Sequence, residues 1–284
     1  MTDNDRVIAL LIDAENVSPK YIQVILDELS VYGTPAYKRI YGDWTSGEMA
    51  SWKKCLLESN LTPIQQFSYT QGKNASDSAM IIDAMDILYT KNCDGFCIVS
   101  SDSDFTRLAA RLRESRMFVI GMGESKTPTS FKSACDTFKY LDVLLNAREG
   151  QAQTEKKAQQ AKTRPAAKKA QKPAAKTPQK PAVEPEPEPA AAPHADPHEE
   201  SALGFVPLEE IVARVKTILD KDSDEDGFMG LSQVGSILGR MYADFDTRNY
   251  GFSKLHKLLD YTGEFETKYE QIPGGGKNLM VKNK

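Results

Sequence analysis

Residues 97–123 read CIVSSDSDFTRLAARLRESRMFVIGMG. A short apolar run is followed by a polar turn with two aspartates, a segment with apolar residues at helical spacing, and a second apolar run. This order predicts a strand over 96–99, a helix over 105–114 and a second strand over 117–122. A strand, a crossing helix and a further strand form a unit in which the two strands lie parallel.

The same alternation extends toward the N-terminus. Residues 7–12 are uninterruptedly apolar, which is typical of a central strand covered on both faces. Ser18 and Pro19 then mark the start of a helix that ends near Gly33. Strict alternation of strands and helices indicates right-handed crossovers, and hence a three-layer α/β domain with a doubly wound parallel sheet. The further segments predicted are strands over 36–41 and 62–67 and helices over 48–58 and 76–89.

The composition bounds the rest of the chain. Its 284 residues suit about two domains, and 40% apolar with 27% charged residues excludes a wholly disordered chain. The longest aliphatic run near the start is far shorter than the roughly 20 residues that cross a bilayer, so no membrane span is expected. Acidic residues stand close to the N-terminus, where a secretory or organellar leader would carry Lys or Arg. This favours a location in the cytoplasm. The four cysteines form neither a CxxC pair nor a Cys/His cluster, which favours buried free thiols over zinc or disulfides.

The charge distribution predicts where the chain divides. Residues 151–182 carry nine Lys or Arg and one Glu, whereas residues 183–200 carry six acids and no base. This Ala-, Lys- and Pro-rich stretch lacks the apolar residues that would offset its ordering entropy, so we expect a disordered linker over 149–202. A flexible coil of that length spans on the order of 40 Å, and we expect the flanking domains to move independently. Its basic half is interpreted as a solvated spacer, with loose phosphate binding as the alternative.

Acidic side chains gather where the predicted strands end. Asp13 closes the first strand, Asp102 and Asp104 follow the fourth, and Asp77 lies in the first turn of the helix before it. Sites in such sheets form beyond the carboxyl ends of the strands, so these four carboxylates are expected to converge. Clustered acids repel one another unless a cation lies among them, and oxygen ligands suit Mg²⁺ or Mn²⁺. The chemistry indicated is phosphodiester hydrolysis.

Simpler roles exist for the single residues. Asp77 is also explained as a first-turn acid favoured by the helix dipole, and Asp104 as the N-cap of the following helix. Asp13 has no capping role so obvious. Asp83 and Asp86 lie inside a helix and are expected on its solvated or interdomain face.

Two other enzyme classes fit poorly. Haloacid-dehalogenase-type phosphatases need a second Asp two residues after the first, and this chain has Glu15 there. Gly121 and Gly123 do not extend to the GxGxxG pattern of dinucleotide-binding enzymes.

A second domain is predicted over 203–284. Helical periodicity covers 209–219, 231–238 and 252–259, and a glycine-rich turn then separates two short apolar segments. Three helices and a β-wing predict a winged helix. The acidic run 222–227 resembles the start of a calcium-binding EF-hand loop, but position twelve would be Gln233 in place of a bidentate Glu. We therefore interpret it as an acidic interhelical loop, with calcium binding as the alternative.

Several motifs resemble a known family. LLIDAENVSP (10–19), GKNASDSAMIIDAMD (72–86) and residues 97–123 resemble the NYN domain of the LabA-like group, in the PIN-like nuclease superfamily. The resemblance covers residues 5–145 and implies a metal-dependent ribonuclease. The positions that match its acidic residues are Asp13, Asp77, Asp102 and Asp104, and those that match its supporting polar residues are Asn16 and Ser101.

The roles expected within this site follow from the resemblance and the charges. Asp13, Asp102 and Asp104 are expected to hold Mg²⁺ or Mn²⁺, and Asp77 to complete the ring or orient the attacking water. Lys73 or Arg107 is expected to contact a substrate phosphate.

The C-terminal stretch LSQVGSILGRMYADFDTRNYGFSKLHKLLD (231–260) resembles the LOTUS or OST-HTH domain. This resemblance implies contact with RNA or docking to a protein partner. Basic residues on or beside the last two helices are the candidates for RNA contact: Arg240, Arg248, Lys254 and Lys257. Alternatively, Arg248 anchors its turn and Tyr250 belongs to the core.

The leading hypothesis is therefore a metal-dependent ribonuclease that acts on RNA, expected to be single-stranded, with a tethered RNA-binding winged helix. The alternative is a catalytically silent adaptor that binds RNA or recruits a protein. A third class is a phosphohydrolase acting on DNA or nucleotides. Helix faces of both domains would allow homo-oligomers, but no sequence feature requires them.

Overall fold

The computed structural model describes residues 6–67, 75–150, 205–224, 226–272 and 276–284. Lys73 and residues 151–202 of the predicted linker lie outside these residues, whereas residues 149 and 150 end a helix over 141–150 and do not belong to a linker. Within them, no helix combines the length and the apolar character needed to cross a membrane.

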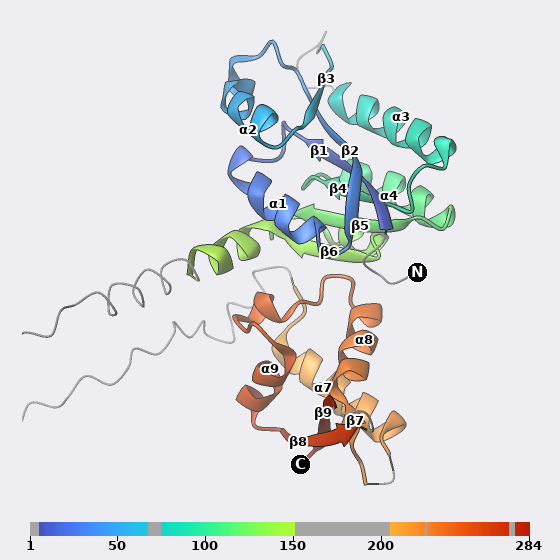
Figure 1. The fold of residues 1–284 in the computed structure, drawn as a ribbon, viewed down its shortest axis with the longest axis vertical. Coiled ribbons are helices and arrows are strands. Elements are labelled where there is room, and N and C mark those ends of the chain that lie inside the picture. The colour runs from blue at the N-terminus through green and yellow to red at the C-terminus, as the bar shows by residue number, and fades with distance from the viewer. Residues whose placement is uncertain (1–5, 68–74, 151–204, 225, 273–275) are drawn as a thin grey trace, which may run out of the picture.

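The N-terminal domain is built on six parallel strands in the order β3-β2-β1-β4-β5-β6 (Figure 1). The order reverses between β1 and β4, so these neighbours form the switch point beyond whose carboxyl ends ligands bind in such folds. The predicted doubly wound α/β fold is confirmed. The strands are β1 (Arg6–Asp13), β2 (Gly33–Gly42), β3 (Thr62–Gln65), β4 (Gly95–Val99), β5 (Phe118–Gly123) and β6 (Thr137–Tyr140).

Helices cover both faces of this sheet. Side chains alternate along β1, so that Ala9 and Leu11 join one core with α3, α4 and α5, while Ile8 and Leu10 join the other with α1 and a helix over 141–150. Both cores consist of apolar side chains, which explains why β1 has no polar residue between Arg6 and Asp13. The numbered helices are α1 (Ile22–Leu29), α2 (Lys53–Glu58), α3 (Ala75–Thr90), α4 (Thr106–Glu114) and α5 (Thr129–Ala134).

Three elements of this domain were not predicted: α5, β6 and the helix over 141–150. α5 has six residues and β6 has four, which is too short for a periodic pattern to emerge. All four cysteines are free, and Cys93, Cys97 and Cys135 are buried in the manner expected from the sequence.

The C-terminal domain contains three helices and a three-stranded sheet in the order β7-β9-β8. The hairpin of β8 and β9 is the expected wing. In the acidic run between α7 and β7, Asp224 accepts hydrogen bonds from the backbone N–H groups of Asp226 and Phe228, which makes it a turn-stabilising residue. The elements are α7 (Leu208–Asp222), β7 (Met229–Gly230), α8 (Leu231–Met241), α9 (Leu255–Thr262), β8 (Phe265–Ile272) and β9 (Gly276–Asn283).

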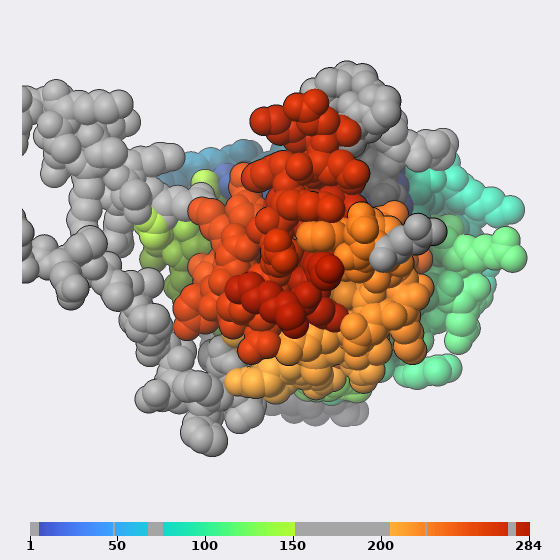
Figure 2. Space-filling view, turned by 90° about the horizontal axis from the view of Figure 1, so that it is seen from below, coloured from blue at the N-terminus to red at the C-terminus, as the bar shows by residue number. Residues whose placement is uncertain are grey.

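The two domains contact each other. The C-terminal domain lies beside the β6 edge of the large sheet, and from below it lies in front of the N-terminal domain (Figures 1 and 2). The segment 243–250, between α8 and α9, carries the hydrogen bonds and ion pairs of this contact. This contact was not expected from the sequence, where the length and composition of the linker favoured independently moving domains.

Candidate metal centre

Asp13 ends β1 and is almost fully buried, with 1% of its surface exposed. Its Oδ1 accepts the backbone N–H groups of Glu15 and Asn16 at 3.1 and 3.2 Å, and its Oδ2 accepts Asn16 Nδ2 and Ser100 Oγ, both at 2.8 Å. Four donors therefore fix this carboxylate. Burial raises the pKa of Asp13, and the hydrogen bonds from Asn16 and Ser100 partly oppose that shift.

The loop after β4 presents the next two carboxylates. The backbone N–H of Asp102 donates to Ser100 Oγ at 3.1 Å, which links this loop to Asp13 through one serine hydroxyl. Asp102 is the N-cap of a 3₁₀ helix over Ser103–Phe105, and its Oδ1 accepts the N–H of Asp104 at 2.9 Å. The cap of this 3₁₀ helix is therefore Asp102.

Asp77, in the first turn of α3, completes the group. Asp77, Asp102 and Asp104 each offer a carboxylate oxygen, and these atoms all lie within 4.8 Å of one another. Asp77 is buried, Asp102 is half-buried and Asp104 is exposed, so the cluster opens from the domain interior to solvent. We call these three residues the acidic cluster.

Three of the carboxylates at this edge have no basic partner within the described part of the protein. There, no lysine or arginine forms an ion pair with Asp13, Asp77 or Asp102. Burial, followed by repulsion from Asp13 and Asp102, raises the pKa of Asp77 to about 7. Converging carboxylate oxygens are the donor set that a hard divalent ion prefers, so the residues of the acidic cluster fit a divalent cation.

The raised pKa of Asp77 predicts a pH-dependent stability. An acid whose pKa is higher in the folded than in the unfolded state binds its proton more tightly when folded, so ionising it destabilises the fold as pH rises from about 4 to about 7. Asp77→Asn removes that repulsion. In EDTA, we expect the variant to have a higher midpoint of thermal unfolding than the wild type at pH 8, and the gap to shrink at pH 5. Equal gaps at both pH values would contradict this electrostatic explanation.

The structure brings together some of the predicted site residues and not others. Asp77, Asp102 and Asp104 come together as expected, but the expected ligand trio contained Asp13 in place of Asp77. Asn16 contacts Asp13 directly, whereas Ser101 Oγ accepts the backbone N–H of Glu124 at 2.9 Å and so fixes the loop after β5. Arg107 is exposed in the first turn of α4.

Sequence reasoning missed residues that position the cluster. Arg39 and Tyr41 of β2 both donate hydrogen bonds to Asp83 of α3, which corrects the expectation that Asp83 lies on a solvated or interdomain face. These bonds join α3 to the sheet six residues beyond Asp77. Sequence reasoning also missed Ser100. The feature that could have revealed it is a hydroxyl side chain between the end of a buried strand and Asp102.

The predicted RNA contacts of the C-terminal domain also differ from one another. Arg240, Lys254 and Lys257 are exposed. Arg248 instead donates to Glu28 and Asp246, so its guanidinium is engaged within the protein and we remove it from the proposed RNA contacts. This is the anchoring role left open as the alternative.

Comparison with known proteins agrees with this architecture. Residues 7–142 match the family model of the NYN domain, and residues 207–275 match that of the OST-HTH/LOTUS domain. A solved structure of a protein of unknown function from Vibrio parahaemolyticus is similar with a TM-score of 0.40 and 16% identity, over 49% of this chain and 94% of that chain. No curated protein matches the chain.

Proposed function

Because the chain joins an NYN domain to an OST-HTH/LOTUS domain, we propose that it is a divalent-metal-dependent ribonuclease whose C-terminal domain adds affinity for RNA. The NYN domain belongs to the PIN-like nuclease superfamily. The observation that carries the proposal is the acidic cluster, which lies at the switch point of the sheet and opens to solvent. A carboxylate-lined, solvent-accessible edge fits phosphodiester hydrolysis better than recognition of RNA alone, since carboxylates repel phosphates unless a cation intervenes.

The acids have two different tasks in this proposal: three of them would hold the metal, and the fourth positions neighbouring groups. Asp77, Asp102 and Asp104 would hold Mg²⁺ or Mn²⁺, which when bound polarises a phosphate and lowers the pKa of water. Asp13 orients Asn16 and Ser100, and through Ser100 the loop that carries Asp102. Arg107, and Lys73 outside the described residues, would contact a substrate phosphate.

The test is cleavage of labelled single-stranded RNA by the purified full chain. We expect cleavage with Mn²⁺ or Mg²⁺ and none with EDTA, and restored cleavage when metal is added back. Parallel reactions on single-stranded DNA and on mononucleotides test the substrate class, and both are expected to remain intact.

Two outcomes would contradict the proposal. RNA that is bound yet remains intact with every metal would favour the catalytically silent adaptor. Cleavage that persists in EDTA would exclude a metal-dependent reaction.

The C-terminal domain is expected to contribute affinity more than rate. Lys254 caps α9 and Lys257 lies in its first turn, and within the described residues neither ammonium group forms an ion pair or a side-chain hydrogen bond. Replacing both by Glu should weaken RNA binding by roughly tenfold and reduce the salt slope by about 1.4, given about 0.7 per phosphate contact on a single strand. Fluorescence anisotropy across a salt series measures both. Lys221→Glu is the control, and an equal loss there would mean that only net charge matters.

A further inference from the structure

The segment 243–250 contacts the edge strand of the N-terminal domain along its backbone. The N–H of Phe138 in β6 donates to the carbonyl oxygen of Ala243 at 2.7 Å, and Thr137 Oγ1 donates to the same oxygen at 3.4 Å. An uncovered edge strand offers unpaired backbone groups, and folded proteins usually cover such edges. The C-terminal domain covers this one.

A network of charged side chains surrounds that backbone contact. Lys139 of β6 donates to Asp246 Oδ2 at 2.5 Å, and Arg248 donates to both oxygens of Glu28 in α1, at 2.8 and 2.9 Å. Arg248 also binds Asp246, so two acids and two bases from both domains alternate. Lys139 and Glu28 are each only 8% exposed. Two parallel hydrogen bonds between a guanidinium and a carboxylate, such as those between Arg248 and Glu28, fix the relative orientation of the two groups more closely than an exposed ion pair does.

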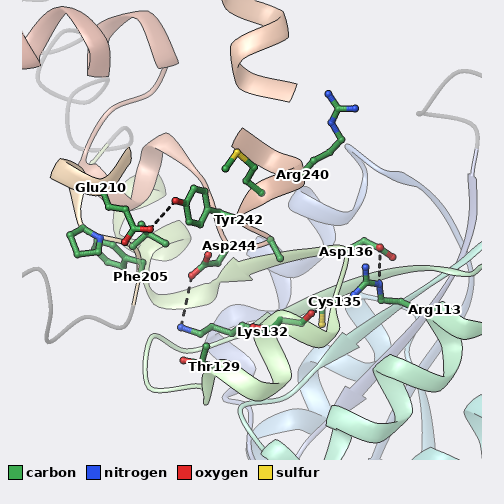
Figure 3. Close-up of a pocket in the computed structure, with 15 residues that line it drawn as sticks. Arg113, Thr129, Lys132, Cys135, Asp136, Phe205, Glu210, Arg240, Tyr242 and Asp244 are labelled. Carbon is green, nitrogen blue, oxygen red and sulfur yellow. Dashed lines mark hydrogen bonds and ion pairs between the residues drawn. The ribbon is translucent and has the colours of Figure 1, made fainter. Parts of the chain in front are cut away.

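A second polar contact lies further along β6. The hydroxyl of Tyr140 donates to Asp244 at 2.6 Å and accepts from Lys132 Nζ at 3.0 Å. Lys132 forms an ion pair with Asp244 at 3.9 Å (Figure 3) and is 4% exposed. Every charged group in this contact therefore has an oppositely charged or hydroxyl partner, which is the condition for keeping charge out of water.

Aromatic rings add an apolar part to the interface. Phe205 lies between Tyr140 and Tyr250, with ring centroids 6.1 and 5.5 Å apart. Tyr250 donates its hydroxyl to the carbonyl oxygen of Val206 at 2.6 Å. Phe205 is 7% exposed, so this part of the interface excludes water.

From these contacts we propose that the segment 243–250 is a docking element that holds the OST-HTH/LOTUS domain on the NYN domain as a lasting intramolecular interface. Asp246 and Arg248 serve this contact and not RNA. The contact is expected to hold without the covalent connection between the domains, which only raises their effective concentration. Docking of the two domains does not depend on whether the acidic cluster cleaves RNA.

The experiment uses the full chain with a site-specific protease sequence inserted after Pro181. After complete cutting, the two parts should elute together in gel filtration at 0.1 M NaCl, because the docking contacts remain. Arg248→Glu should raise the dissociation constant of the cut parts at least 100-fold. Combining it with Glu28→Arg should recover at least tenfold, because the swapped charges attract again. Lys221→Glu, at an exposed position near the end of α7, is the control and should leave association within twofold.

The opposite results would overturn the proposal. Wild-type parts that elute separately at 0.1 M NaCl would show that the interface does not hold. An Arg248→Glu variant that associates like the wild type but has lost RNA affinity would assign Arg248 to RNA. If Arg248→Glu fails to fold, Glu28→Arg in the other domain tests the same contact.

Discussion

Asp102→Asn is expected to lower metal-dependent RNA cleavage on the order of 10³-fold while leaving the fold intact. A metal ion contributes several kcal/mol of transition-state stabilisation, and each 1.36 kcal/mol corresponds to a factor of ten in rate. The substitution removes one charge of the acidic cluster. Because the N-cap role of Asp102 uses only Oδ1, which accepts the N–H of Asp104, an asparagine oxygen can keep that hydrogen bond. Structure and charge are therefore separated at this position.

The matched control is Asp86→Asn, which removes an exposed carboxylate from α3, the helix that carries Asp77. Single-turnover cleavage rates and the metal concentration at half-maximal rate should be unchanged in this control. For Asp102→Asn, unfolding midpoints close to the wild type and a rate below 1% of it are expected. A variant that keeps more than a tenth of the wild-type rate would place the cleavage outside the acidic cluster.

The fold of the N-terminal domain was predictable because its strongest signals are local. An apolar run such as 7–12 and the helical spacing over 105–114 each specify an element, and their alternation specifies a parallel sheet. The carboxyl-end rule then predicts that Asp13 and Asp102 lie at the same edge of the sheet, and the strands that they follow, β1 and β4, are paired neighbours. β6 escaped prediction because four residues, two of them polar, do not form a pattern.

The division of labour among the acids was not predictable from the sequence. Asp13 was expected to bind metal because it ends a strand, but four hydrogen-bond donors surround its carboxylate. Asp77 was expected to complete the ring or to orient the attacking water. In the structure, one of its carboxylate oxygens lies within 4.8 Å of carboxylate oxygens of Asp102 and Asp104. Such assignments depend on the directions of the side chains and on the distance between α3 and the sheet, which Asp83 helps to set. The periodicity of the sequence carries no information about either.

The docking of the two domains was hidden for a related reason. Lys139 and Glu28 are 111 residues apart and read as ordinary surface charges, and Asp246 and Arg248 read as a turn. Only the structure shows that the four form one alternating network. Complementarity between separate surfaces has no period in the sequence, so composition pointed to independent domains.

Lys139→Met is expected to destabilise the full chain by about 3 kcal/mol, because it leaves the buried Glu28 and the half-buried Asp246 with one base. Methionine keeps the apolar stem, so the loss reports the charge. Burial alone would raise the pKa of Asp246, but Arg248 and Lys139 hold it below its usual range. A carboxyl with a lowered folded pKa contributes stability above its unfolded value near 3.8, which is lost as pH falls through the folded value. Without Lys139 the pKa of Asp246 rises, so the penalty should shrink between pH 7 and pH 4.

Urea unfolding at both pH values measures this effect. Lys126→Met is the control, since Lys126 pairs with Glu124 at 2.8 Å but its side chain is 73% exposed, and it should cost less than about 1 kcal/mol. The comparison separates a buried interdomain charge from a surface one within the same α/β domain. If Lys139→Met costs no more than the control, or if its penalty is the same at pH 4 and pH 7, the network does not stabilise the docked domains. A large penalty at pH 7 that is smaller at pH 4 is the result that a desolvated Lys139–Asp246 pair requires.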